Sequence, residues 1–418
     1  MLKIVYSICC GIDIHKKFVV ATVGKTNKSG VTEYQTKQFS TFTEDLRLLL
    51  DWLKSQSCKH VCMESTGKYW HPVFNILEHD CEVVVANPKY VKGIRGKKTD
   101  KKDSIWLCDL HKHGLVPSSF IPPLPIRQIR DLMRYRFKLI NFKSSEKNRF
   151  QNSLTVSNIM ISSVVSDTFG ASSMRIIQHI LDHPDDMNFD VSSMLHARMK
   201  SKTDTIVKSI QGHLTEPQAD KMRVCLDHME SIEKNIAEIE SVVLKLVQPY
   251  MRQIELILSL PSIKDVFTAI TVIGEIGVDM SVFLSDKHLC SWAGLTPQNN
   301  ESAGKKKSVR VSRAGVYIKP LLVQCANAAI KSKKCPYFKI RYDQIKKRRG
   351  HKKAIIAIAH RLLVCIYHML DKNEPFNEEL YTIESKPKPT YAPQITEDMA
   401  IRYLETLGYQ IPDKLKQC

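Results

Sequence analysis

Four carboxylates stand where an apolar segment ends or a helix begins. Asp13 lies between two isoleucines, and Glu64 ends the apolar run KHVCM just before Ser, Thr and Gly. Asp100 and Asp103 are three residues apart at the start of a helical stretch, so both side chains lie on one helix face. A buried carboxylate is costly without a cation. If the four converge, they could hold two divalent cations about 3.5 to 4 Å apart and catalyse phosphoryl transfer.

Each of these acids also has an ordinary structural explanation. Taken singly, an Asp in a strand or a Glu before Ser-Thr is more often a strand-end or edge residue. The TDKKD run is typical of a solvated helix start, because the helix dipole favours Asp there. The residues alone therefore leave a metal site and a set of solvated acids both open.

The elements that must position the acids follow an α/β pattern. Residues 6–23 predict a β-hairpin with its turn at residues 15–17, and further strands are predicted near residues 34–40, up to Glu64, and over CEVVVANP. Helical periodicity separates these strands, which predicts a mixed sheet. In an RNase H-like fold the first strand, a neighbouring strand and a late helix converge, which would bring the four acids together.

The rest of the chain is predicted to be mainly helical. A basic helix begins near Leu124, and an apolar seam from Met222 to Leu246 at near-heptad spacing predicts a partner, either the first helix or another subunit. The fold class expected is α/β plus all-α. Its parts are an RNase H-like sheet domain (1–123), a helical, coiled-coil-like assembly region (124–250), a mainly α domain with a serine loop and basic helices (251–373), and a linker with tail (374–418).

The charge balance favours a polyanionic partner. The chain of 418 residues has 62 Lys and Arg against 43 acids, a formal net charge of +19. Eleven cations and one acid lie between Lys331 and Lys353, interleaved with Tyr337, Phe338 and Tyr342, which suits phosphate contacts and stacking on unpaired bases. The basic helix from Arg127 to Arg149 suggests the same, although a solvated helix face is the usual explanation for such charge.

Membranes and disulfides are disfavoured. No apolar run approaches the length needed to cross a bilayer, which predicts a cytoplasmic protein without membrane binding. The 12 cysteines include no CxxC pair, so they are predicted to be reduced and structural. His111 and His113 point to different sides of a helix and are predicted to be surface residues.

Two blocks of sequence resemble a known family. GIDIHKKFVVATV, VCMESTGKYW and KKTDKKDSIWLCDL follow in order the DEDD motifs of the IS110-type transposases, whose N-terminal domain resembles the Holliday-junction resolvase RuvC. LCSWAGLTPQNNESAGKKKSVRVSRAGVYIKPLLVQCANAAI resembles the second signature of that family. The resemblance spans roughly residues 8–125 and 254–372.

The resemblance implies a site and its cofactor. Asp13, Glu64, Asp100 and Asp103 would be catalytic acids that bind Mg²⁺, with two metals expected, and Ser302 would be a serine nucleophile. Ser308 and Ser312 stay open as alternatives, because the family has a Ser-Gly-Gly type sequence where this chain has Ser-Ala-Gly. The family's PGIG is PSIK at residues 261–264, and a common arginine is Lys319, which keeps the charge but loses bidentate phosphate geometry.

The cations near the serine could stabilise the charge of a phosphoryl-transfer transition state. A mobile phosphate-binding loop with a serine for solubility is the plainer alternative. The cations expected to bind nucleic acid are Lys305, Lys306, Lys307, Arg310, Arg313, Lys319, Lys346, Lys347, Arg348 and Arg349.

The function expected from the resemblance is DNA strand cleavage and exchange by an IS110-type transposase. Its partners would be double-stranded donor and target DNA, a structured guide RNA (the bridge RNA of the family), and further copies of the chain in a dimer or tetramer. Two alternatives remain: a RuvC-like structure-specific endonuclease, and a non-catalytic nucleic-acid-binding descendant of a transposase.

Overall fold

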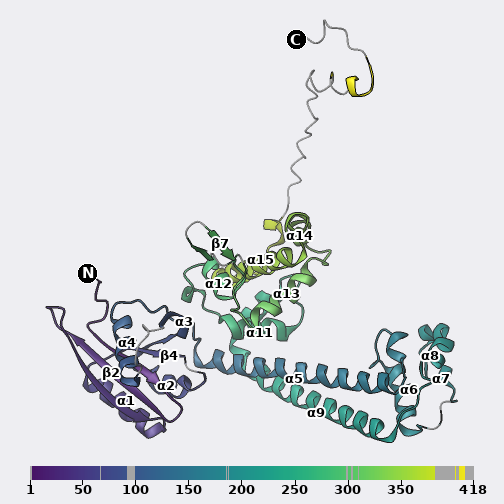
Figure 1. Cartoon of the computed structure of the whole chain (residues 1–418), viewed down its shortest axis with the longest axis horizontal. Coiled ribbons are helices and arrows are strands. Elements are labelled where there is room, and N and C mark those ends of the chain that lie inside the picture. The colour runs from purple at the N-terminus through teal and green to yellow at the C-terminus, as the bar shows by residue number, and fades with distance from the viewer. Residues whose placement is uncertain are drawn as a thin grey trace. The chain divides into compact units, whose positions relative to one another are not determined.

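The chain divides into two compact units, Met1–Pro122 and Pro123–Cys418. The structure is a computed structural model, drawn in Figure 1. It describes residues 2–65, 67–91, 99–184, 186, 188–297, 300–302, 305–308, 310–381, 401 and 404–409. Most of the expected linker and tail lies outside the described residues.

The first unit is built on a mixed five-stranded sheet, as the sequence predicts. The strand order is β3-β2-β1-β4-β5: β2 pairs antiparallel with β1 and β3, and β4 pairs parallel with β1 and β5. This arrangement is compatible with an RNase H-like domain. The strands are β1 (Ile8–Ile14), β2 (Phe18–Thr26), β3 (Thr32–Ser40), β4 (His60–Glu64) and β5 (Glu82–Ala86).

Helices cover both faces of the sheet. One face packs its alternate residues Cys10, Ile12 and Ile14 against α1 (Thr43–Ser55) and α2 (Trp70–Leu77) in one apolar core. The other face is covered by α4 (Asp100–Lys112), and the short helix α3 (Pro88–Val91) accepts a hydrogen bond from Trp106 of α4 at the carbonyl of Val91. Side chains alternate along a strand, so Asp13 belongs to the α4 face.

A glycine sets how closely α4 approaches the first strand. A Cβ built on Gly11 would lie 2.2 Å from the Ser104 carbonyl oxygen and 2.3 Å from the Cys108 amide nitrogen, both backbone atoms of α4. Only a residue without a side chain permits this contact. Thr22 and Ser104 add a buried hydrogen bond of 2.7 Å between their hydroxyls, which fixes the helix along the sheet.

Gly11→Ala should therefore destabilise the first unit, by about 1–3 kcal/mol, because α4 must move away from the sheet. Thermal unfolding followed by circular dichroism measures the loss. Gly170→Ala is the matched control, since its nearest new contact would be 3.3 Å away and its backbone is extended. Equal effects of the two substitutions would contradict the close packing at Gly11.

His111 is buried, so the prediction that it is a surface residue is wrong. Its side chain is 3% exposed, and Tyr6 stacks between the rings of His60 and His111, with centroids 4.3 and 4.8 Å away. Burial, together with the neighbouring His60, lowers the pKa of His111 to about 4. The i,i+2 spacing indicates that the two histidines point to different sides of the helix, but it does not indicate that the Tyr6 ring covers His111.

The unfolding free energy should fall as the pH drops from about 6.5 to 4. His111 takes a proton in the unfolded chain at its ordinary pKa but stays neutral in the folded chain down to about 4, so acid favours unfolding by up to about 3 kcal/mol. His111→Phe keeps a ring against Tyr6 and removes the proton site. Urea titrations at pH 4, 5, 6 and 7 should give a flatter profile for this variant. Identical profiles for the two proteins would exclude His111 as the cause.

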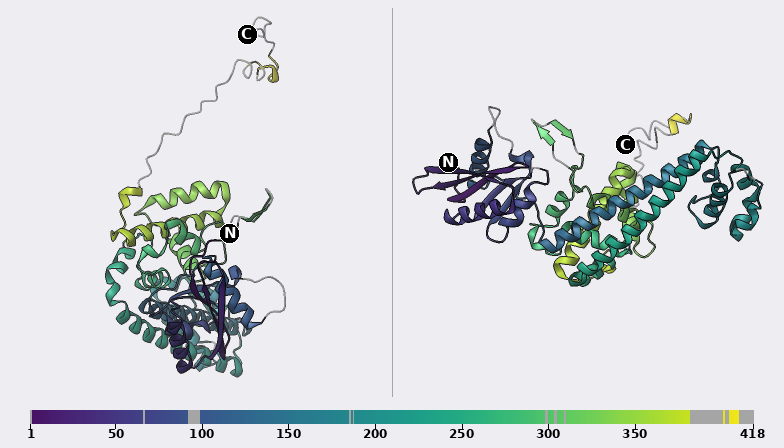
Figure 2. Two further views of the ribbon diagram at one scale, coloured as in Figure 1. Left: turned by 90° about the vertical axis from the view of Figure 1, so that its left-hand side faces the viewer. Right: turned by 90° about the horizontal axis from the view of Figure 1, so that it is seen from below.

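The second unit begins with two long helices that pack side by side, α5 (Leu124–Val156) and α9 (Glu216–Leu246), as Figures 1 and 2 show. They run in opposite directions, because Arg136 pairs with Glu240 and Lys143 with Glu233. The apolar seam of α9 thus has a partner within the chain. Beyond their far ends, a second apolar core holds α6 (Ala171–Asp182), α7 (Val191–Met194) and α8 (Thr203–Ser209).

The remaining helices form the C-terminal part of this unit. They are α10 (Met251–Leu258), α11 (Val266–Ile276), α12 (Asp286–Trp292), α13 (Ile318–Ala329), α14 (Pro336–Arg349) and α15 (His351–Lys372). The first turns of α5 are fixed on α11: Arg134 donates two hydrogen bonds to the buried carboxylate of Glu275, at 2.6 and 2.8 Å, and Arg130 donates to the carbonyls of Gly274 and Glu275.

One helix contradicts the prediction that no segment is apolar enough to cross a bilayer. The 22-residue α15 is long enough, and its most apolar window has a mean hydropathy of 1.5. However, 56% of that window is buried inside the protein. A helix that is apolar on most sides is also what the core of a helical domain requires.

Candidate functional site

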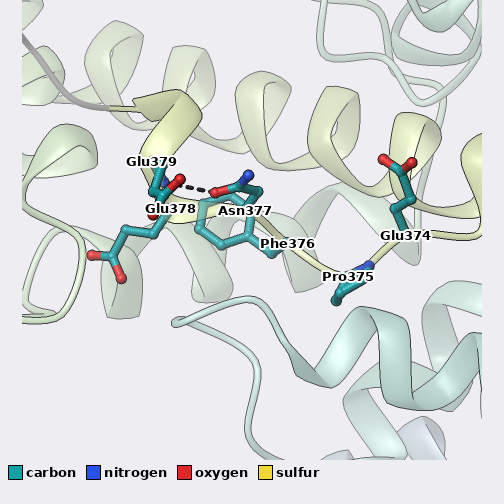
Figure 3. Close-up of a pocket in the computed structure, with 6 residues that line it drawn as sticks. All are labelled: Glu374, Pro375, Phe376, Asn377, Glu378 and Glu379. Atoms are coloured by element: carbon teal, nitrogen blue, oxygen red, sulfur yellow. Dashed lines mark hydrogen bonds between the residues drawn. The ribbon is translucent and has the colours of Figure 1, made fainter.

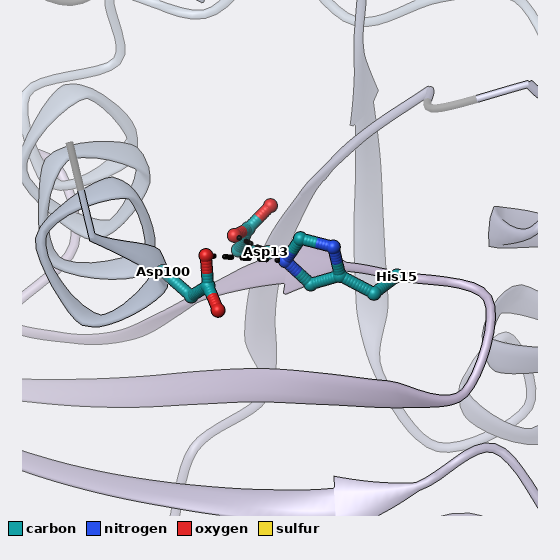
Figure 4. Close-up of side chains that lie close together, drawn as sticks. All are labelled: Asp13, His15 and Asp100. Carbon is teal, nitrogen blue, oxygen red and sulfur yellow. Dashed lines mark hydrogen bonds and ion pairs between the residues drawn. The ribbon is translucent and has the colours of Figure 1, made fainter.

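Asp13, His15 and Asp100 converge at the end of β1 (Figure 4). The His15 Nε2 lies 3.2 Å from Asp13 Oδ2 and 3.3 Å from Asp100 Oδ1. Asp13 is near the end of β1 and Asp100 is the first residue of α4, so the contact between Gly11 and α4 brings their carboxylates together. The structure thus unites two of the four predicted acids through a histidine.

Glu64 is placed beside Asp13 by the strand register. Ile12 pairs with Met63 in the parallel ladder between β1 and β4, so the next residues, Asp13 and Glu64, are neighbours. Alternation from the buried Cys62, which packs under α4, puts Glu64 on the same face. Glu64 is half-buried and lies at the end of its strand, as the sequence predicts.

Asp103 lies one turn further along α4, and its charge acts on Asp13. Burial raises the pKa of Asp13, the His15 contact opposes this shift, and the charges of Asp100 and Asp103 add to it. Thr99 caps the helix by accepting a hydrogen bond from the Lys102 amide. The exposed amides of this helix start favour negative charge on Asp100 and Asp103.

His15 is the residue that the sequence prediction missed. It follows Asp13 by two residues, so a strand that continued this far would present both side chains on one face. The turn orients it: the His15 amide donates to the Phe18 carbonyl at 2.9 Å, and the His15 ring packs against the Phe18 ring at 4.6 Å. The D-x-H spacing of Asp13 and His15 could have indicated this neighbour, but residues 15–17 were predicted only to connect two strands.

These side chains fit a divalent cation. Asp13 and Asp100 are like charges, and His15 contacts both of them, while burial disfavours the charged form of Asp13. Carboxylate oxygens are the ligands that hard divalent ions prefer, and one nitrogen is compatible with several such ions. The ligand atoms of the three residues all lie within 4.8 Å of one another.

The second predicted site is a β-hairpin. The sequence predicted an irregular loop here, but β6 (Asn300–Ser302) and β7 (Lys305–Ser308) pair antiparallel and project from the helices (Figure 2). Ser302 pairs with Lys305 next to the turn, and Ser308 pairs with Asn300 at the other end. For Ser302, Ser308 and Lys305 to Lys307 the structure describes the backbone, and their side chains lie outside the described part.

The segment after the hairpin is held by Lys319. Its ammonium donates to the carbonyls of Ser312 and Ala314 at 2.6 and 2.8 Å, and burial lowers its pKa. The Ser312 hydroxyl accepts a hydrogen bond from the Ala314 amide at 3.2 Å. Tyr317, the residue before α13, then packs under the Arg134 guanidinium at 4.5 Å, so the start of α13 contacts α5. Arg310 and Arg313 are both exposed.

Part of the predicted nucleic-acid surface is used inside the protein. On α5, Arg130 and Arg134 bond to α11 and Arg136 pairs with Glu240 of α9, so the prediction that this helix offers its cations to nucleic acid is wrong for these three residues. Lys143 and Arg149 form ion pairs at the surface, so for them a nucleic-acid contact stays a prediction. By contrast, the four cations Lys346 to Arg349 at the end of α14 are exposed.

Two of the three aromatic residues of α14 are covered, which contradicts their predicted role in base stacking, whereas Tyr337 is half-buried. Phe338 is fully buried and Tyr342 is 6% exposed. The segment after α15 covers this region: Phe376 and Tyr381 stack with centroids 5.0 Å apart and pack near Phe338, and the Phe376 amide donates to Ser259. Figure 3 shows the pocket along this segment, lined by residues 374–379.

Comparisons with known proteins agree with the two blocks of motifs. Residues 10–159 match the family model of the DEDD transposases of IS110 type, and residues 254–343 match the model of the IS116/IS110/IS902 transposase family. The first match contains all four acids, and the second contains the serine hairpin. Together the two matches cover more than half of the chain.

Two relatives share nearly the whole length of the chain. They are the pilin gene-inverting proteins of Moraxella lacunata and Moraxella bovis, each 23% identical over an alignment of 372 residues that covers 83% of this chain and 93% of the relative. The family also suggests a divalent metal, in agreement with the cluster at the end of β1. With both models matched in order along its length, the chain belongs to the IS110 family of transposases, enzymes that cleave and exchange DNA strands.

Proposed function

We propose that this protein recombines double-stranded DNA with two sites, the acids of the first unit and a serine of the hairpin. The observation that carries the proposal is the convergence of Asp13, His15 and Asp100, with Glu64 next to Asp13 in the strand register. Solvated acids would not need to gather on one sheet face under a close-packed helix. A RuvC-like fold of the first unit is part of the proposal.

The four acids of the first unit would together bind the Mg²⁺ ions. Asp13 and Glu64 come from neighbouring strands, and Asp100 and Asp103 from one face of α4, so the four could hold two Mg²⁺ ions. Bound there, the ions would stabilise the charge that develops on the attacking and leaving oxygens of a phosphate. The chain's own contribution is the rigid placement of these carboxylates by β1, β4 and α4.

Ser302 would supply the nucleophile. Its hydroxyl oxygen forms a bond to a DNA phosphorus, the bond from phosphorus to the leaving strand breaks, and the serine proton passes to a base. The backbone supports Ser302 over its two alternatives, since Ser302 lies next to the hairpin turn, Ser308 lies at the far end, and the Ser312 hydroxyl accepts a local hydrogen bond. The cations expected around it would stabilise the transition state.

The relatives suggest what the recombination accomplishes. Their printed name describes inversion of a pilin gene, and inversion requires that two duplexes be cut, exchanged and rejoined. We include in the proposal a structured guide RNA that selects donor and target, a dimer or tetramer that holds two duplexes, and a cytoplasmic location. The net charge of +19 is compatible with binding both nucleic acids.

The test is to incubate the purified protein with duplex, nicked and branched DNA, with and without Mg²⁺ and the RNA encoded beside its gene. Recombinant products that need both Mg²⁺ and RNA support the proposal. Cleavage of branched DNA without RNA and without rejoining would identify a structure-specific endonuclease. Binding without any cleavage would identify a non-catalytic descendant.

Nucleic-acid affinity should fall steeply with salt, and the exposed end of α14 should account for part of the slope. Each duplex phosphate neutralised contributes about 0.9 to the slope of log affinity against log salt concentration. Replacing Lys346, Lys347, Arg348 and Arg349 by Ala should therefore flatten the slope by up to about 3 to 4. Fluorescence anisotropy from 50 to 300 mM salt measures it. An unchanged slope would exclude this surface as a phosphate contact.

A further inference from the structure

His15 is not one of the four predicted metal-binding acids, yet its side chain lies between two of them, Asp13 and Asp100. Its Nε2 approaches an oxygen of Asp13 to 3.2 Å and an oxygen of Asp100 to 3.3 Å. Adjacent ligands of an octahedral ion with bonds of about 2.0–2.2 Å lie about 3 Å apart. The two contacts therefore have the spacing of neighbouring ligands on one ion.

The position of the ring is built by the chain. The turn that carries it is fixed by the hydrogen bond from the His15 amide to the Phe18 carbonyl, and Thr41 donates to the Lys16 and Lys17 carbonyls with its hydroxyl and its amide. The Phe18 ring packs against the imidazole. The ring is 40% exposed, so an ion from solution can reach it.

We propose that His15 is a metal ligand, and that the cation position it shares with Asp13 and Asp100 selects Mn²⁺ over Mg²⁺. The inference rests on the proposed function in one respect, that these acids hold divalent cations. Mg²⁺ keeps oxygen ligands and water, whereas a first-row transition ion also accepts an imidazole nitrogen. Mn²⁺ shares the octahedral, oxygen-rich geometry of Mg²⁺ and so gains from the nitrogen without losing the carboxylates.

The choice of ion follows from the donor set. Two carboxylate oxygens and one nitrogen are too few soft donors for a structural zinc site, which takes four protein ligands, mostly sulfur and nitrogen. No cysteine belongs to the described cluster. The second cation position, held by Glu64 and Asp103, would offer oxygen donors alone and would not select Mn²⁺ over Mg²⁺. The two cation positions of the site would therefore differ in which ion they prefer.

Calorimetric titration of the full chain without nucleic acid tests the selectivity. His15→Ala should lower the Mn²⁺ affinity about tenfold or more and change the Mg²⁺ affinity less than about twofold. His15→Asp restores an oxygen ligand and should raise the Mg²⁺ affinity relative to Mn²⁺. His113→Ala, which changes another histidine of the same unit far along α4 from Asp100, should match the wild type.

Pulsed electron paramagnetic resonance of bound Mn²⁺ tests the ligand directly. The wild-type protein should show coupling to a histidine nitrogen, which changes on ¹⁵N labelling of histidine and disappears in His15→Ala. Equal losses of Mn²⁺ and Mg²⁺ affinity in His15→Ala, or no nitrogen coupling in the wild type, would overturn the inference and leave the acids as cation ligands. If Asp13→Asn binds both ions as the wild type does, the proposed function fails as well.

Discussion

Asp13→Asn should lower the rate of DNA strand cleavage by about a thousandfold or more. A metal-binding carboxylate stabilises charge in the transition state by several kcal/mol, and each 1.4 kcal/mol corresponds to a factor of ten. Glu64→Gln should have an effect of the same order, because Glu64 neighbours Asp13 in the strand register. Single-turnover cleavage of labelled donor DNA measures both rates.

Nucleic-acid binding should change little in these variants, since the exposed cations of α14 lie in the other unit of the chain. Asp109→Asn is a matched control on α4: Asp109 bonds to Lys112 and Tyr34, away from the helix start. Its cleavage rate should stay within a few-fold of the wild type. Wild-type cleavage by Asp13→Asn, or cleavage unaffected by EDTA, would show that the acids do not hold catalytic cations.

Ser302→Ala should abolish cleavage and the covalent intermediate together. If the serine oxygen attacks a DNA phosphate, the energy of the broken strand is kept in a phosphoserine ester, so the strands can be rejoined without ATP. Alanine has no hydroxyl and cannot form the ester. Reactions stopped in denaturant and digested should yield, for the wild type alone, a nucleotide-modified peptide covering residues 298–305.

The alternatives for the nucleophile give distinct results. An adduct on Ser308 or Ser312 would move the role to that residue, and Ser308→Ala and Ser312→Ala serve as paired controls. Asp13→Asn should also lose the adduct, but for lack of a cation, and should keep its binding of DNA. Full activity of Ser302→Ala with no adduct in the wild type would assign cleavage to the acids alone.

The backbone that carries the acids could be predicted because local rules decide it. Strand alternation and the helix start at Thr99 place Asp13, Glu64 and the two acids of α4 without knowledge of distant contacts. The close approach of α4 depends on Gly11, which the sequence contains but does not distinguish from other glycines. His15 was missed because a turn residue can point to either side until its partner, here Phe18, is known.

The charged and aromatic residues were harder to assign because their partners are distant in sequence. Arg134 and Glu275 are separated by 141 residues, so a charge that suggested a nucleic-acid contact serves instead to join α5 to α11. Phe338 lies among lysines and arginines in the sequence, which suggested an exposed aromatic ring, but the segment around Phe376 covers it. Composition correctly reports how many cations exist and cannot report which of them are already paired.

The α5 and α9 pair is long enough that a small change of angle at one end moves the other end by several ångströms. Helices of 33 and 31 residues rise about 1.5 Å per residue, so the pair spans roughly 45 Å between α11 and the core of α6 to α8. Arg130 and Arg134 hold the end of the pair that lies on α11. A tilt of about 5° at this end would move the other end, beside α6 to α8, by about 4 Å. A partner that binds the far end could therefore move the start of α13, where Tyr317 packs on Arg134 nine residues after the serine hairpin, without touching it.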